Sequence, residues 1–355
     1  MINNTKSLNV VSVPLAQSKR IEFIDAMRGF TIFLVVLNHV ALHCLNISES
    51  TPTFYRYLIQ VEMPMFCLIS GFVFYKKNTI WSFQHIIRFF KKKAFVFLLS
   101  PLLFYIIYLH TRGIPFIDGV LSDSKYGYWY TYTLMIFFAI YVLVNSVFKD
   151  KLADIVLLAI GFTFYLSNWP PLIEILPIKE ELLSFMSFRH WSFFLYFAIG
   201  ILIRKYFAFV EDLLNSKWFL CISISFYMLG NAFEDIIPLR YSIKQLPLIL
   251  AGLCVCWSFF RNKQNVLSSK TGIGRFMLFI GRRTLDIYLI HFFLLPENLS
   301  FIRVFNECPV PILDLTVCSI VAIIIIAICL LIGSIIRLSP VLAHCVFGEK
   351  MQETK

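Results

Sequence analysis

The sequence predicts an all-α polytopic membrane protein with about ten transmembrane helices and both termini in the cytoplasm. Hydrophobic residues make up 59% of the 355-residue chain and charged residues only 15%, and the mean hydropathy is +0.76. Soluble globular proteins carry about 25% charged residues. The apolar residues also recur in runs of about 16 to 25, and a helix needs about 20 residues to cross hydrocarbon. This composition excludes an ordinary soluble enzyme and makes the lipid bilayer a partner of the protein.

Ten apolar runs follow one another along the chain, and we interpret each as one span. The fifth and seventh are the weakest, because each is short and is followed by a polar or proline-rich stretch. We therefore expect a cytoplasmic N-terminal segment at 1–23, a ten-helix membrane domain at 24–340 and a cytoplasmic tail at 341–355. The predicted spans, in order, are 24–45, 54–75, 94–109, 128–148, 152–166, 191–207, 218–233, 243–260, 277–295 and 313–338.

The basic residues indicate the orientation of these spans. The chain has 32 lysines and arginines against 21 acidic residues, a net charge of +11, and the basic residues lie in short clusters between apolar runs. With the N-terminus inside, the inner segments hold about three times as many basic residues as the outer ones, which is the bias of short cytoplasmic loops. The charge therefore indicates topology rather than a nucleic-acid partner. The nine cysteines are scattered without paired spacing, so no metal site is predicted.

The first span carries the strongest functional signal, because ionisable side chains in hydrocarbon are costly and usually face a protein interior or a wet cavity. Arg28 and His39 are eleven residues apart, which places them on one helix face and about 16 Å apart along the axis. Asp25 precedes Arg28 by three residues and can pair with it. The plainer interpretation is an interfacial ion pair and a packing histidine. His43 shares the face of His39, but no nearby carboxylate or cysteine completes a metal site.

The second span combines a helix breaker with small residues. Pro64 removes a backbone donor, and Ser70 with Gly71 permits close approach of another backbone, so a kinked and closely packed helix is expected. Glu62 lies just before the proline, either as an interfacial residue or on the side of the acceptor.

A dense basic cluster lies at the start of the third span. It serves either to anchor the helix at the cytoplasmic face or as an electrostatic mouth for a phosphorylated cytoplasmic donor. The cluster consists of Arg88, Lys91, Lys92 and Lys93.

The ninth span holds a second polar group of residues. Tyr288 and His291 are three residues apart and share a helix face beyond the pair Arg282–Arg283. His39 and His291 lie at similar depth, so the two imidazoles can approach one cavity from different helices. The alternative is a packing histidine bonded to a backbone carbonyl.

Taken together, these motifs resemble the acyltransferase-3 family of integral membrane O-acyltransferases. The motifs run in order from the first span to the ninth. One position departs from the family pattern: where members often have Arg-x-x-Arg, Arg88 is followed by Lys91, and lysine lacks the bidentate fork of arginine. The resemblance rests on Asp25-Ala26-Met27-Arg28-Gly29 with His39, on Met63-Pro64-Met65-Phe66 leading to Ser70-Gly71, on Tyr128-Trp129-Tyr130, and on Gly281 through Tyr288 to His291.

The resemblance implies a bacterial inner-membrane enzyme that moves a small acyl group, such as acetyl, from cytoplasmic acyl-CoA to a hydroxyl of an envelope polysaccharide or glycolipid. Acyl-CoA enters as a substrate, and no bound cofactor is expected. Arg28 and His39 are implied to be necessary for transfer, with His39 either as general base or as the nucleophile of an acyl-imidazole relay. The predicted catalytic residues are Asp25, Arg28, His39, Tyr288 and His291, and the predicted substrate-binding residues are Glu62, Ser70, Arg88, Lys91, Lys92, Lys93 and Trp129.

Two other classes of protein fit the same composition. A transporter or flippase for an envelope glycolipid would use the intramembrane charges as a polar pathway, but the sequence lacks paired broken helices and repeats. A polytopic scaffold without chemistry would leave Arg28 and His39 unexplained. Release of free CoA from a thioester separates an enzyme from a carrier.

Overall fold

The computed structural model describes residues 21–45, 57–58, 60–77, 79–167, 179–214, 216–233, 241–296, 299 and 311–349. Within these ranges every regular element is a helix and none is a strand, so the all-α prediction is confirmed. Most of the predicted N-terminal segment, at 1–20, and the end of the predicted tail, at 350–355, lie outside the described residues.

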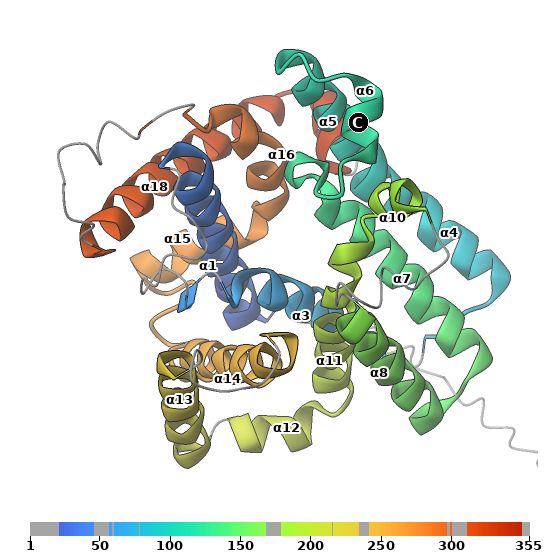
Figure 1. Cartoon of the computed structure of the whole chain (residues 1–355), viewed down its shortest axis with the longest axis vertical. Helices are drawn as coiled ribbons and strands as arrows, with labels where there is room; N and C mark the ends of the chain where they lie inside the picture. The colour runs from blue at the N-terminus through green and yellow to red at the C-terminus, as the bar shows by residue number, and fades with distance from the viewer. Residues whose placement is uncertain are drawn as a thin grey trace, which may run out of the picture.

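The helices succeed one another with short connections (Figure 1). The first half of the chain holds α1 (Glu22–His39), η1 (Val40–Cys44), α3 (Glu62–Phe74), α4 (Phe83–Ala94), η2 (Phe95–Leu99), α5 (Ser100–Thr111), α6 (Phe116–Leu121), η3 (Lys125–Gly127), α7 (Trp129–Val147) and α8 (Asp150–Ser167). The second half holds α10 (Glu180–Phe185), η4 (Phe188–Phe193), α11 (Phe194–Lys205), α12 (Phe207–Leu214), α13 (Lys217–Ala232), α14 (Tyr241–Asn262), α15 (Gly272–Arg282), α16 (Thr284–Leu294), α18 (Pro311–Ile336) and α19 (Pro340–Phe347).

Several of these helices are long and apolar enough to cross a bilayer. Five meet that test in the described chain, and the bent pair Phe188–Lys205 and Phe207–Leu214 makes a sixth if it counts as one span. The five are Glu22–Cys44, Phe83–Thr111, Trp129–Val147, Ile243–Asn262 and Leu313–Ile336. The chain is therefore an integral membrane protein, while the number of ten spans and the cytoplasmic position of both termini remain predictions.

The ninth predicted span differs most from the structure. Instead of one helix over 277–295, α15 ends at Arg282 and α16 begins at Thr284. Arg283 takes φ −111° and ψ 21°, which is outside the helical region and breaks the chain between two ion-paired arginines. The second predicted span, 54–75, corresponds to the shorter helix α3.

Helix α1 lies at the centre of the bundle and contacts α3, α14, α15, α16 and α18 (Figure 1). Within its most apolar window 72% of the residues are buried, against 22% for the helix over Phe83–Thr111. The apolar core has two parts, and α1 contributes to both, with its first half in one and its second half in the other. Charged residues on α1 are therefore placed inside protein rather than against lipid.

Glycines allow the backbones of two helix pairs to touch. Helices α3 and α11 cross at Gly71 and Gly200, where an added Cβ would collide with the carbonyls of Phe197 and Leu68. Helices α1 and α15 cross in the same way at Gly29 and Gly281. Such small-residue crossings are the usual way to pack membrane helices, because close contact replaces the hydrophobic effect that is missing in lipid.

The helix formed by α4, η2 and α5 lies at the periphery. In α4 no residue is fully buried, and the charged residues cluster at its C-terminal end, where Lys91 and Lys92 are exposed. The wide turn η2 comes just before Pro101, which has no N–H to give to the preceding turn. On α5, Leu103 and Ile107 are about half exposed, which suits a face in contact with lipid tails.

A buried carboxylate ties α16 to the end of α18. Asp286 is 1% exposed and accepts from both arms of Arg337, with Nη2 to Oδ1 at 2.8 Å, while Arg283 approaches at 3.3 Å. The Arg337 guanidinium also lies 3.8 Å from the ring centre of Phe347 in α19. Gly333 makes room for this carboxylate, because a side chain there would collide with Asp286.

Candidate active site

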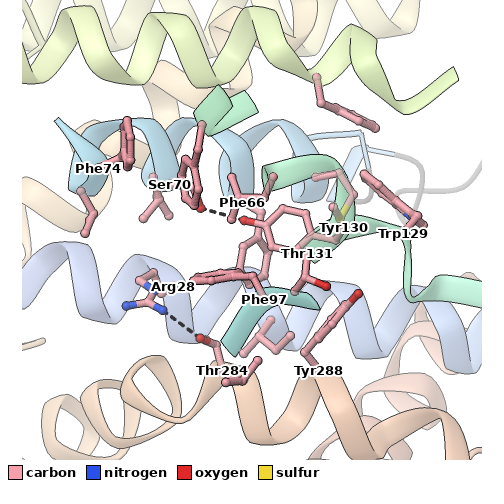
Figure 2. Close-up of a pocket in the computed structure, with 18 of the residues that line it drawn as sticks. Arg28, Phe66, Ser70, Phe74, Phe97, Trp129, Tyr130, Thr131, Thr284 and Tyr288 are labelled. Atoms are coloured by element: carbon pink, nitrogen blue, oxygen red, sulfur yellow. Dashed lines mark hydrogen bonds between the residues drawn. The ribbon is translucent and has the colours of Figure 1, made fainter. Parts of the chain in front are cut away.

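A cavity of about 720 Å³ lies between α1, α3, α4, α7, η4 and α16. In Figure 2, Phe74 and Arg28 lie at one end of the labelled residues and Trp129 at the other. Polar and charged side chains from six separated segments reach the cavity in an otherwise largely aromatic wall. They are Arg28, Asn38, His39, Glu62, Ser70, Lys76, Thr79, His85, Lys93, Tyr130, Thr131, His190, Thr284, Tyr288 and His291.

The two histidines of the predicted catalytic group meet in this cavity. His39 Nδ1 lies 3.0 Å from His291 Nε2, and the two rings are nearly parallel, with an angle of 8° between their planes. His291 is fully buried, and its Nδ1 lies 2.8 Å from the carbonyl oxygen of Ile287. The ring of Phe292, 4.6 Å from that of His39, covers the pair.

This hydrogen-bond chain fixes the tautomers of both neutral rings. A carbonyl only accepts, so His291 Nδ1 must carry a proton and donate it to Ile287. In a neutral ring the other nitrogen, His291 Nε2, then accepts, and His39 Nδ1 must be its donor. The lone pair of His39 is left on Nε2, which makes no hydrogen bond to any described residue. The arrangement yields a neutral imidazole whose basic nitrogen is available at a cavity wall.

Arg28 lines the cavity at the opposite end of α1. Its Nη2 donates to the Thr284 hydroxyl at 3.0 Å, as Figure 2 shows, and its Nη1 lies 3.9 Å from Asp25. Asp25 is 4% exposed, does not line the cavity, and also pairs with Arg282 at 3.2 Å. Asp25 therefore acts on the site through Arg28, by holding its guanidinium in place.

The basic end of the cavity contains one member of the predicted basic cluster. Lys93 lines the cavity, and it lies within electrostatic range of Lys76 and Arg28. Arg88, Lys91 and Lys92 project from the exposed face of α4 and do not line the cavity. The inner lining is thus strongly positive, which suits an anionic group such as a phosphate.

The middle of the cavity carries hydroxyls and one carboxyl. Ser70 and Tyr130 share a hydrogen bond of 2.7 Å across the cavity (Figure 2), and Glu62, 6% exposed, accepts from Asn38 at 2.7 Å. The hydroxyls of Tyr288 and Thr131 are buried beside the cavity and have no hydrogen-bond partner among the described residues. Donors of this kind can stabilise a charge that develops in a reaction.

Several lining residues were not predicted from the sequence. Tyr130 and Asn38 adjoin predicted residues, and their neighbours in sequence were a usable signal. Lys76 and His190 lie in connections between spans, and Thr284 follows a helix break, so no periodic pattern marks them. Among the described residues, no group of three histidine, cysteine, aspartate or glutamate side chains lies close enough to hold a metal ion.

Comparison with known families agrees with this geometry. A family model described as an acyltransferase domain matches residues 21–334, which includes every residue of the cavity wall. The chain therefore belongs to the acyltransferase-3 family. No curated protein and no solved structure gives a significant match to the chain.

Proposed function

We propose that this member of the acyltransferase-3 family is a membrane O-acyltransferase, which moves a small acyl group such as acetyl from cytoplasmic acyl-CoA to a hydroxyl of an envelope polysaccharide or glycolipid. The observation that carries the proposal is the chain from the Ile287 carbonyl through His291 to His39, which presents a basic nitrogen inside a cavity with a positive end. The family supplies the acyl transfer, and the geometry assigns parts to its residues.

The positive end of the cavity receives the donor. Phosphates of acyl-CoA would lie near Arg28, Lys76 and Lys93, which line the cavity together. The uncharged pantetheine arm would extend along α1, where Arg28 and His39 are separated by about 16 Å. With the N-terminus inside and ten spans, this end faces the cytoplasm of a bacterial inner membrane, and the other end faces the acceptor.

In the transfer step, the acceptor hydroxyl oxygen bonds to the thioester carbonyl carbon while His39 Nε2 takes the hydroxyl proton. The carbonyl oxygen becomes an oxyanion, to which the hydroxyls of Tyr288 and Thr131 can donate. The carbon–sulfur bond then breaks, and the thiolate receives the proton from His39 Nε2. The products are the acyl ester and free CoA, so atoms and charge balance and His39 is restored.

A second route uses the same residues in two steps. His39 Nε2 would bond to the acyl carbon and release CoA, and the acceptor hydroxyl would then take the acyl group from the imidazole. The tautomer favours both routes equally, because each needs a lone pair on Nε2. Detection of acyl-His39 by mass spectrometry after rapid quenching, without acceptor, would select this route.

The test uses the full chain purified in lipid nanodiscs with acetyl-CoA. We expect the protein to release free CoA thiol, and we expect His39→Ala to lower that rate by about a hundredfold or more. The matched control is His43→Ala, because His43 lies one turn further on, is exposed and does not line the cavity. Full activity in His39→Ala refutes the proposal, and absence of CoA release by the wild type favours a glycolipid carrier.

The acceptor is identified in cells. Envelope polysaccharides from cells with and without this protein are compared by mass spectrometry for acyl esters. A mass difference of one acyl group that disappears in His39→Ala supports transfer to an envelope hydroxyl. Identical polysaccharides in the two strains contradict that acceptor class.

A further inference from the structure

Three aromatic rings stack at the end of the cavity that lies away from Arg28. The indole of Trp129, the first residue of α7, lies 3.9 Å from the ring of His190 and 5.5 Å from that of Phe193, with interplanar angles of 21° and 17°. His190 and Phe193 are three residues apart on the 3₁₀-helix η4, where such side chains eclipse. All three rings line the cavity.

The loops that hold this stack are strained and tied to each other. Lys125 and Tyr126, just before Trp129, take φ of 45° and 47°, and Ser187, just before η4, takes φ of 52°. Non-glycine residues seldom adopt this left-handed conformation, and such residues cluster at functional sites. The Lys125 ammonium donates at 2.9 Å to carbonyls of both loops, those of Val120, Ser122 and Ser184. Trp129 and His190 are thereby held in a fixed relation.

Polar groups border the ring stack. His190 Nδ1 is buried without a hydrogen-bond partner among the described residues, and it lies 3.9 Å from the carboxylate of Asp123. Arg189 lies 4.0 Å from the same carboxylate. Burial raises the pKa of Asp123, although Arg189 and Lys125 act in the opposite direction. A ring stack with a polar rim suits a ligand that has a flat apolar face and hydroxyls around its edge.

The stack connects to the two histidines through ring contacts. Tyr130 lies 6.0 Å from Trp129 and 6.1 Å from Tyr288, measured between ring centres. Tyr288 is one helical turn from His291, which bonds His39. A molecule bound on the stack can therefore extend a hydroxyl along this wall toward His39 Nε2.

We propose that Trp129, His190 and Phe193 form the acceptor subsite, which binds one pyranose ring by its C–H face while His190 and Asp123 bond its rim hydroxyls. This inference rests on the proposed function for its role, but not for its ligand chemistry. A saccharide is favoured over an acyl chain, because a lipid tail would gain nothing from the polar rim. It is favoured over a linear polyol, because only a ring offers a rigid flat face.

Binding is tested without catalysis. The full chain in nanodiscs is mixed with methyl β-glucoside, methyl β-galactoside or sorbitol, and saturation-transfer NMR records contact with each probe. We expect transfer to the ring C–H protons of at least one glycoside and little transfer to sorbitol. Trp129→Leu and His190→Leu should each reduce the glycoside signal about fivefold or more, whereas Trp129→Phe should keep most of it. Trp218→Leu is the matched control, because Trp218 is 81% exposed and distant from the cavity lining.

The outcomes separate this subsite from the proposed function. Equal signals from wild type and Trp129→Leu, or equal signals from glycosides and sorbitol, overturn the subsite even if CoA release is intact. Loss of glycoside contact in Trp129→Leu supports it even if the wild type releases no CoA, in which case the transfer proposal fails alone. In an active protein, Trp129→Leu should raise the KM for glycoside about tenfold and leave the KM for acetyl-CoA unchanged.

Discussion

His39 and His291 lie on different helices, α1 and α16, and share one hydrogen bond of 3.0 Å between Nδ1 and Nε2. Because His291 is itself bonded to a backbone carbonyl, the proton position of one ring determines that of the other. The second histidine is thus a positioning residue for the first, and the two have different tests.

His291→Leu should lower kcat by about a hundredfold with little change in the KM for acyl-CoA, because His39 loses the acceptor that keeps its lone pair on Nε2. His291→Gln should recover part of that loss, because a glutamine carbonyl can accept from His39 Nδ1–H. The measurement is CoA release at several donor concentrations. Equal activity of the leucine and glutamine variants would show that His291 is only a packing residue.

Lys93→Met should raise the KM for acyl-CoA about fivefold, because one positive charge is removed from the cavity lining and such a charge is worth about 1 kcal/mol near a surface. Lys92→Met is the matched control, since Lys92 is exposed on the same helix and does not line the cavity. The rates are compared at low and high salt. Equal effects of the two substitutions would assign the whole cluster to membrane anchoring.

Arg28→Lys should raise the KM for acyl-CoA about tenfold while the protein still inserts, because an ammonium cannot bond Thr284 and a phosphate in the planar fork of arginine. Thr284→Val should give a smaller effect in the same direction, since it removes one bond that orients Arg28. An unchanged KM in both variants would remove Arg28 from the donor end.

Asp286→Asn should destabilise the protein by about 3–5 kcal/mol, because it leaves Arg337 and Arg283 beside a buried neutral group. Glu349→Gln is the control, because Glu349 bonds the same Arg337 from an exposed position, and exposed pairs contribute about 1 kcal/mol or less. Thermal unfolding in detergent compares the two. A larger loss in Glu349→Gln than in Asp286→Asn would contradict the role assigned to the buried carboxylate.

Gly71→Ala should destabilise the crossing of α3 with α11 by about 1–3 kcal/mol, because the added methyl group would collide with the Phe197 carbonyl. Gly272→Ala is the matched control, since nothing lies near its Cβ position and alanine favours a helix. The yield of folded protein after detergent extraction and its melting temperature measure the effect. Equal stability of the two variants would mean that the helices separate readily.

The helical membrane fold could be predicted because hydrocarbon admits few other structures, and the face shared by Arg28 and His39 followed from helix geometry. Both residues line one cavity. The break at Arg283 was not predicted, because hydropathy averages over the two arginines that end α15. Nor could spacing separate Lys93 from Arg88, Lys91 and Lys92, since their exposure depends on how α4 is rotated against its neighbours. His190 required two loops to meet, which no local pattern encodes.

The glycine crossings have a consequence for how the reaction cycle proceeds. The helices that carry Arg28, His39 and Ser70 are locked to neighbours by touching backbones, whereas the wall that carries Lys93 has no fully buried residue over α4. Exchange of spent thiol for fresh thioester therefore depends on the loosely held wall rather than on the catalytic helices. Turnover should respond to the thickness and order of the surrounding bilayer, even though no lipid touches the reacting atoms.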